Sequence, residues 1–274
     1  MYDKTPYCAI FCGPSTLDIV ALALKVYKYA QVNIEIQLVI PKEYSYYAEK
    51  MADEFGVSVY FDENIQDFEI VNTFLQHHRD ELLGRSWKWY KQQYLKLGLA
   101  WKSDRMVFIH DGDTIFSPSI FERLIQEPFL LTTRERVDIY LAGLKLLGIP
   151  LGYKSYIANG GIFYPSILLN ISSDPSSWFI DAIKKCVLSS NVDQVDFSEY
   201  QIMGSLLQDS IPSRQLKLFR RFDLLAGENI SKINYLNIIK SLKKYDAIAL
   251  EMYHHRNLSK RIVARLLYSL GFSW

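Results

Sequence analysis

Two aspartates that directly follow an apolar run have the residue type and the spacing of a cation site. Asp111 and Asp113 flank Gly112 and come after the apolar residues 107–109. Side chains two positions apart in an extended chain point to the same side, so both carboxylates can reach one ion. Carboxylate oxygens suit Mg²⁺ or Mn²⁺, which would neutralise a bound diphosphate, and Gly112 lets the backbone approach such a ligand closely. The alternative is a turn that carries two solvated aspartates.

Three further segments combine polar side chains with glycine or with helical spacing. Gly13-Pro14-Ser15 ends an apolar run and is either a ligand-binding turn or an ordinary connection between a strand and a helix. Gln93 and Lys96 lie one helical turn apart and either contact a ligand or form a solvated helix face. Asn159-Gly160-Gly161 interrupts a predicted strand, which indicates either a ligand close to the backbone or a β-bulge.

These segments belong to a chain in which apolar runs and helical patterns alternate. The first part predicts strands at 7–13, 34–40 and 57–61 and helices at 17–30 and 43–55, with Gly56 as the C-cap of the second helix. Such an order is typical of a parallel sheet with right-handed crossovers. Helices are then predicted at 67–83 and 86–101 and a fourth strand at 106–110. Ligands of such sheets bind outside the carboxyl ends of the strands, where Asp111 lies.

The later part of the chain is less regular. It predicts helices at 121–126, 139–147, 178–188 and 199–207, a strand at 156–164 and a late strand at 247–253. An aromatic stripe along the 86–101 helix predicts core packing, and it consists of Trp87, Tyr90, Tyr94 and Trp101. The sequence has neither an internal repeat nor a linker-like stretch, so we expect a single α/β domain over residues 1–274.

The composition excludes several classes of protein. Hydrophobic residues make up 49% of the 274 positions and charged residues 22%, which excludes a disordered or low-complexity chain. No apolar run reaches the roughly 18 residues of a transmembrane helix, and the first residues lack the basic segment of a signal peptide. Cys8, Cys12 and Cys186 cannot form a disulfide framework. We therefore expect a cytoplasmic protein.

Charge is unevenly distributed along the chain. Residues 214–274 contain 12 Lys or Arg and 4 Asp or Glu, a balance of +8, whereas the whole chain carries +1. A membrane, a nucleic acid or an anionic acceptor would complement this basic end. The predicted helix at 258–270 is apolar on one side and carries Lys260, Arg261 and Arg265 on the other. It either packs on the core or lies on an anionic membrane, in which case the protein is peripheral at the inner face of the cytoplasmic membrane.

The strand order and the Asp-Gly-Asp segment together resemble a nucleotide-sugar glycosyltransferase with the GT-A fold, whose Asp-x-Asp motif holds a metal ion and the donor diphosphate. The resemblance covers most of the chain. Residues 89–97, the Asp-Gly-Asp strand and Ser198-Glu199-Tyr200 also resemble a bacterial family of Asp-x-Asp glycosyltransferases assigned to cell-surface glycans. The resemblance to GT-A enzymes implies a GT-A-like, mostly parallel central sheet flanked by helices. Residues to about 117 would bind the nucleotide sugar and those from about 118 the acceptor.

The same resemblance implies roles for individual residues. Glu199, behind the expected N-cap Ser198, would deprotonate the acceptor hydroxyl if the reaction inverts, with Asp196 as second choice, although the helix dipole alone also favours an acid there. His254 would complete the metal site, and Lys260 would contact the donor phosphates, although Asn257 replaces a glycine frequent in the family. The other residues expected to contact the donor are Gly13, Pro14, Ser15, Gln93, Lys96, Asp111, Asn159, Gly160 and Gly161.

The prediction is a glycosyltransferase that uses Mn²⁺ or Mg²⁺ to move a sugar from a nucleotide diphosphate sugar, in the first instance a UDP-sugar, to a glycan or lipid-linked glycan acceptor. We expect it in bacterial surface polysaccharide synthesis and expect no nucleic acid partner. A nucleotidyltransferase of similar fold would carry a basic, glycine-rich turn where this chain has Gly13-Pro14-Ser15. A phosphatase of the haloacid dehalogenase type would continue with Gly-Thr where Thr114-Ile115 stands. A non-catalytic binding module is the third alternative.

Overall fold

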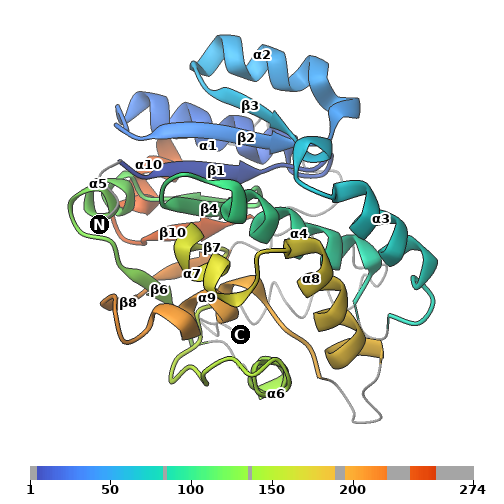
Figure 1. Cartoon of the computed structure of the whole chain (residues 1–274). Coiled ribbons are helices and arrows are strands. Elements are labelled where there is room, and N and C mark those ends of the chain that lie inside the picture. The colour runs from blue at the N-terminus through green and yellow to red at the C-terminus, as the bar shows by residue number, and fades with distance from the viewer. Residues whose placement is uncertain (1–4, 83–84, 135–137, 189–194, 221–234, 251–274) are drawn as a thin grey trace, which may run out of the picture.

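The computed structural model describes residues 5–82, 85–134, 138–188, 195–220 and 235–250 (Figure 1). Within these residues the central sheet has the strand order β3-β2-β1-β4-β7. The first four strands are parallel, and β7 pairs antiparallel with β4. The strands are β1 (Tyr7–Phe11), β2 (Glu35–Ile40), β3 (Ser58–Phe61), β4 (Val107–Asp111) and β7 (Gly160–Phe163). The predicted mostly parallel α/β sheet is therefore confirmed.

The helices of the first half follow the predicted alternation. They are α1 (Leu17–Tyr29), α2 (Ser45–Phe55), α3 (Phe68–His77) and α4 (Trp87–Lys102), with short 3₁₀ turns at Lys42–Tyr44 and Asp62–Asn64. Gly56 ends α2 in the left-handed conformation, with φ of 69°, which confirms the predicted C-cap. The side chain of Ser86 accepts a hydrogen bond from the Trp89 N–H and thereby caps α4. Helix α3 ends at His77, before the predicted limit of 83.

The aromatic stripe of α4 packs in the core, as its spacing predicts. Tyr90, Tyr94 and Trp101 are buried. Helices α3, α7 (Pro165–Ile171) and α8 (Pro175–Ile183) pack against α4, and α8 continues as a π-helical turn at Lys184–Leu188. This packing fixes α4 beside the sheet, so the opposite face of α4 meets the region beyond the ends of the strands.

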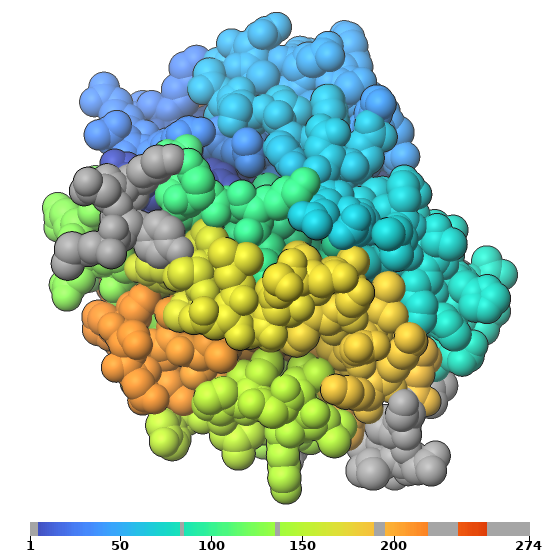
Figure 2. All heavy atoms as spheres, in the orientation of Figure 1, coloured from blue at the N-terminus to red at the C-terminus, as the bar shows by residue number. Residues whose placement is uncertain are grey.

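In its described residues, the second half contains the helices predicted near 121–126, 139–147 and 199–207 and the predicted late strand, together with four short strands and a last helix that the sequence pattern does not predict. Strand β5 (Thr114–Phe116) pairs with β10 (Ala247–Ala249), β10 pairs with β9 (Leu218–Arg220), and β6 (Leu130–Thr132) pairs with β8 (Ser213–Gln215). The remaining helices are α5 (Pro118–Gln126), α6 (Asp138–Leu146), α9 (Glu199–Leu207) and α10 (Tyr235–Leu242). Figure 2 shows segments of the second half, yellow-green to orange, packed directly against the green and cyan segments that precede them in the chain.

Two predicted strands are shorter in the structure. The strand predicted at 156–164 comprises only β7, because Asn159 adopts the left-handed conformation with φ of 53° and turns the chain just before it. The late strand predicted at 247–253 ends at Ala249, and residues 251–253 lie outside the described residues. Among the described helices, none combines the length and the apolar character that crossing a bilayer requires.

The register of the central sheet places two loops side by side. Phe11, the last residue of β1, is the partner of Asp111, the last residue of β4. The turn at Gly13-Pro14-Ser15 and the Asp-Gly-Asp turn therefore leave the same edge of the sheet. Because ligands of parallel sheets bind at this edge, the pairing of β1 with β4 defines where a site can lie.

Candidate functional site

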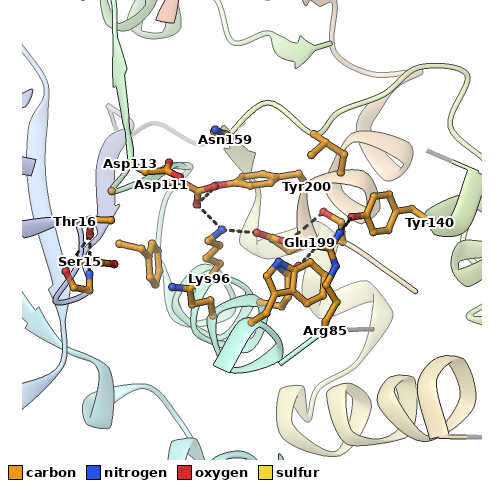
Figure 3. A pocket seen from close by; sticks show the side chains of 18 of the residues that line it. Ser15, Thr16, Arg85, Lys96, Asp111, Asp113, Tyr140, Asn159, Glu199 and Tyr200 are labelled. Atoms are coloured by element: carbon orange, nitrogen blue, oxygen red, sulfur yellow. Dashed lines mark hydrogen bonds and ion pairs between the residues drawn. The ribbon is translucent and has the colours of Figure 1, made fainter. Parts of the chain in front are cut away.

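A cleft of about 550 Å³ opens at the carboxyl edge of β1 and β4. Its walls come from the β1–α1 turn, from α4, from the turn between β4 and β5, from the segment before β7 and from the start of α9 (Figure 3). The predicted site residues that line it are Gly13, Ser15, Gln93, Lys96, Asp111, Asp113, Asn159 and Glu199. Segments far apart in the sequence thus meet in one cavity.

Asp111 lies at the centre of this cleft and is held by two side chains. The Lys96 ammonium nitrogen lies 2.5 Å from Oδ1 of Asp111, and the Tyr200 hydroxyl donates a hydrogen bond of 2.8 Å to the same oxygen. The Lys96 nitrogen also lies 4.6 Å from the centre of the Tyr200 ring. The carboxylate is therefore oriented from one side by residues of α4 and α9 (Figure 3).

Lys96 and Glu199 form a second buried ion pair. The Lys96 nitrogen lies 2.6 Å from Oε1 of Glu199, and the side chains are 6% and 1% exposed. Burial alone would lower the pKa of Lys96, but Asp111 and Glu199 more than reverse this effect, so the pKa lies above its ordinary value and the ammonium group stays charged. Of the two interpretations of Gln93 and Lys96, the solvated helix face is therefore wrong, since both side chains are buried.

The start of α9 is capped in an unexpected way. Ser198 occupies the predicted N-cap position, but its hydroxyl donates to Oε2 of Glu199, at 3.3 Å, and makes no capping hydrogen bond with the helix backbone. Instead Oε1 of Gln93 accepts a 2.9 Å hydrogen bond from the Glu199 N–H. Helix α4 therefore fixes both the backbone and the carboxylate of Glu199.

Asp196, the second choice for the base, is not among the residues that line the cleft. Its Oδ1 accepts hydrogen bonds from the Tyr90 hydroxyl, at 3.3 Å, and from the Phe197 N–H, at 2.8 Å. Burial raises its pKa to about 6, against the opposing effects of the Phe197 N–H and of Arg85. Its contacts anchor the segment before α9, whereas Glu199 faces the cavity.

The Gly13-Pro14-Ser15 turn is closed by the residue that follows it. The Thr16 N–H donates to the Gly13 carbonyl oxygen, at 2.9 Å, and the Gly13 N–H donates to Oγ1 of Thr16, at 3.0 Å. Gly13 and Ser15 line the cleft, and Pro14 is an exposed residue of the same turn. This end of the cleft offers backbone groups at the start of α1.

Gly112 packs the two loops against each other. A Cβ atom on Gly112 would lie 2.5 Å from the Phe11 carbonyl oxygen and 2.8 Å from Oγ1 of Thr16. The glycine therefore permits close packing against the β1–α1 turn, and because Gly112 also lines the cleft, its close approach to a ligand stays a prediction. A larger residue at this position would push the Asp-Gly-Asp turn away from β1.

The glycines of the Asn159 segment also have structural partners. A Cβ atom on Gly160 would lie 2.6 Å from the Phe116 ring, and one on Gly161 would lie 3.2 Å from the Tyr200 ring. Both glycines pair in regular register with β4, which excludes a bulge, and neither lines the cleft, so their predicted contact with the donor stays a prediction. Asn159 does line the cleft, where its amide donates to Oγ1 of Thr114, at 3.0 Å, and its carbonyl accepts from the Asp111 N–H, at 2.9 Å.

The predicted metal ligands are in part assembled. Asp111 and Asp113 both face the cleft, and two carboxylates are hard oxygen donors of the kind that Mg²⁺ and Mn²⁺ accept together with water or phosphate oxygens. Within the described ranges, no group of three or more His, Cys, Asp or Glu side chains could hold an ion. His254, Lys260 and the predicted helix at 258–270 lie outside the described residues. The two carboxylates present fit such an ion.

Several lining residues had no assigned role in the sequence interpretation, among them Tyr200, which contacts Asp111, and the neighbouring residues Arg85, Trp89 and Tyr140. The Arg85 guanidinium lies 5.0 Å from the Trp89 ring centre, donates a 3.2 Å hydrogen bond to the Tyr140 hydroxyl and lies 3.8 Å from Asp196. Arg85 lies just before the N-cap of α4, outside the helix, so helical spacing does not indicate its contact with Trp89. No local signal indicates Tyr140, because α6 reaches the cleft only through tertiary packing.

Comparisons with known proteins support the fold. No model of a protein family and no curated protein matches this sequence. The structure is similar to that of the galactosyltransferase LgtC in complex with donor and acceptor sugar analogues, with a TM-score of 0.52, 13% identity and coverage of 96% of this chain and 95% of LgtC. The glycosyltransferase GlyE of Streptococcus pneumoniae TIGR4 aligns with a TM-score of 0.46, 13% identity and coverage of 98% of this chain and 64% of GlyE. The LgtC likeness shows that the chain has a GT-A-like fold.

Proposed function

We propose that this protein is a metal-dependent glycosyltransferase that moves a sugar from a nucleotide diphosphate sugar to a glycan or lipid-linked glycan acceptor. One observation carries the proposal. In a GT-A-like fold, the cleft at the carboxyl edge of β1 and β4 brings together two carboxylates, Asp111 and Asp113, and the buried ion pair of Lys96 with Glu199. These are the groups that binding and cleaving a glycosyl diphosphate requires.

The donor would lie along the cleft from the β1–α1 turn to the Asp-Gly-Asp turn. Gly13 and Ser15 line the end at which the nucleotide would enter. Asp111 and Asp113 would hold Mn²⁺ or Mg²⁺, which, when bound, supplies Lewis-acid stabilisation of the departing diphosphate. Lys96 would present its charge to the same oxygens, because it is fixed beside Asp111.

Glu199 is the proposed base. Its Oε1 accepts from Lys96 and its Oε2 from Ser198, and each carboxylate oxygen has two lone-pair directions, so it can still accept the proton of an acceptor hydroxyl. Removal of that proton makes the hydroxyl oxygen a better nucleophile, as an inverting reaction requires. The acceptor would enter from the end lined by Arg85, Trp89 and Tyr140, because the nucleotide and the diphosphate fill the rest.

A thermal-shift panel tests this proposal. The panel contains nucleotide sugars, nucleoside triphosphates and free nucleotides, each with and without Mn²⁺. A ligand that binds only the folded state raises the melting temperature, so a nucleotide sugar should stabilise the protein, and more so with Mn²⁺. Asp113→Ala is the matched control and should lose the part of the rise in melting temperature that depends on Mn²⁺. Stabilisation by nucleoside triphosphates but by no nucleotide sugar would replace the proposal with a nucleotidyltransferase.

The proposed pathway and location are bacterial surface polysaccharide synthesis at the inner face of the cytoplasmic membrane. The support is the +8 charge of residues 214–274 and the amphipathic pattern at 258–270. A lipid-linked acceptor would be anchored at that surface, so attachment of the enzyme would raise its local concentration near the acceptor.

A further inference from the structure

His110 is a fully buried histidine directly before the first aspartate of the cleft, and it is not among the lining residues. Its Nδ1 lies 2.8 Å from the Asp111 carbonyl oxygen, and its Nε2 lies 2.7 Å from the Tyr27 hydroxyl. A carbonyl oxygen can only accept, so Nδ1 carries the hydrogen and Nε2 of the neutral ring is an acceptor. The Tyr27 hydroxyl must therefore donate to His110.

Tyr27 extends this network to the far side of the turn. Its hydroxyl oxygen accepts a 2.9 Å hydrogen bond from the Phe116 N–H in β5. Three consecutive hydrogen bonds thus run from Phe116 through Tyr27 and His110 to the Asp111 carbonyl. They join the end of β4 to β5 across the turn that carries both carboxylates, and every hydrogen in the series has one acceptor.

Aromatic rings surround this network and exclude water from it. The His110 ring lies edge-on to Phe116, with centres 5.0 Å apart, and Tyr27 lies edge-on to Phe121, also at 5.0 Å. Buried hydrogen bonds of this kind are costly to break, because each partner would be left unpaired in an apolar surrounding. The turn is therefore held in one conformation from its buried side.

We propose that Tyr27 and His110 are positioning residues that fix the Asp111–Asp113 turn in the geometry that its carboxylates need to bind a divalent cation. The inference rests on the metal site of the proposed function. Partners behind metal ligands orient those ligands, and their loss weakens metal affinity by about 10–100-fold. Neither side chain touches the cleft, so the effect is transmitted through the backbone of the turn.

Mn²⁺ titration followed by electron paramagnetic resonance tests the inference without any turnover measurement. His110→Phe removes the donor to the Asp111 carbonyl and should weaken Mn²⁺ binding by about 10–100-fold. Tyr27→Phe should weaken it in the same direction. His110→Asn should recover much of the affinity, because the asparagine amide can occupy the position of Nδ1 and donate to the same carbonyl. Wild-type affinity in both His110→Phe and Tyr27→Phe would overturn the inference.

Phe121→Leu is the matched control for a general loss of stability. It removes core volume beside Tyr27 and should lower the melting temperature, yet it leaves all three hydrogen bonds in place. Its Mn²⁺ affinity should stay within about twofold of wild type. If it weakens Mn²⁺ binding as much as His110→Phe does, the network is ordinary core packing and the inference is wrong.

Hydrogen exchange separates this inference from the proposed function. If wild-type protein binds no Mn²⁺ at the cleft, the metal site of the proposed function fails. The positioning role is then judged by the amide of Phe116 in the metal-free protein. Tyr27→Phe should speed its exchange by at least about fivefold, the effect of one lost hydrogen bond, while Phe121→Leu should not. Unchanged exchange in Tyr27→Phe would show that the network does not hold the turn.

Discussion

The ammonium group of Lys96 lies 2.6 Å from the carboxylate of Glu199, although 103 residues separate them in the chain. This contact joins α4 to the start of α9, so the residue expected to contact the donor and the residue expected to act as base form one unit. Asp111 shares the same ammonium group. Substituting any of the three must therefore change the environment of the other two.

Asp113→Ala should abolish transfer and leave the fold intact. Loss of a metal ligand removes several kcal/mol of transition-state stabilisation, which predicts a decrease of about a hundredfold or more in turnover. Steady-state kinetics at saturating donor measure this, with circular dichroism as the check on folding. Asp53→Ala, at an exposed position of α2, is the control and should behave as wild type. Near-normal turnover of Asp113→Ala would refute the metal assignment.

Glu199→Gln should lower kcat and barely change donor affinity. Glutamine keeps the shape and the contact with Ser198 but cannot take up a proton. The measurement is a separate determination of kcat and of the donor Kd by calorimetry. Weaker donor binding with turnover preserved would make Glu199 a binding residue. If Asp196→Asn loses turnover while Glu199→Gln does not, the base is Asp196.

Lys96→Met should destabilise the protein strongly. It leaves the carboxylates of Asp111 and Glu199 without their shared buried counter-charge, which costs about 3–5 kcal/mol when a buried partner is removed. Urea unfolding measures this loss. Adding Glu199→Gln to the same chain should restore part of the stability, because one of the unpaired charges is then gone. Strictly additive effects of the two substitutions would contradict the coupling.

Stability should depend on the titration of Asp196. Burial raises its pKa to about 6, whereas the unfolded chain has the ordinary value of about 3.9. At pH values between these two pKa values the native state binds more protons than the unfolded state. The stabilising contribution of Asp196 to the free energy of unfolding is therefore present below about pH 4 and is lost as pH rises through 6. Urea midpoints of wild type and Asp196→Asn at pH 4, 5.5 and 7 measure this. The stability of Asp196→Asn should increase relative to that of wild type as pH rises. A difference in stability that stays constant over this pH range would contradict the raised pKa.

Vesicle co-sedimentation should detect binding of the basic C-terminal segment to anionic membranes. Each Lys or Arg near such a surface contributes about 1 kcal/mol, and salt screens the attraction. Changing Lys260, Arg261 and Arg265 to Glu should therefore release the protein at low salt. The same change at Lys25, Lys50 and Lys102, which are exposed and lie outside residues 214–274, is the charge-matched control and should sediment as wild type does. Equal sedimentation of wild type and the first variant would mean that residues 258–270 do not hold the protein at the membrane.

The sequence by itself determined the first half of the fold and the place of the two aspartates. Strands β1 to β4 and helices α1 to α4 follow from local periodicity. Gly56 ends α2 in the left-handed conformation, and a C-cap of this kind depends only on residues close to it in the chain. Asp111 and Asp113 come at the end of a buried strand, and the carboxyl ends of parallel strands meet at one edge. Those properties depend on residues close together in the chain.

Tertiary structure alone decided which contacts the site residues make and which of them are buried. Gln93 and Lys96 follow the pattern of a polar helix face, yet they are buried because α9 packs across them and brings Glu199 to Lys96. Gly112 is required by the Phe11 carbonyl and Thr16, which the pairing of β1 with β4 places beside it. The three-residue strands β5, β6, β8 and β9 are too short to show a period of two. Contacts between segments a hundred residues apart depend on how the elements pack, and no local pattern of residue types encodes that packing.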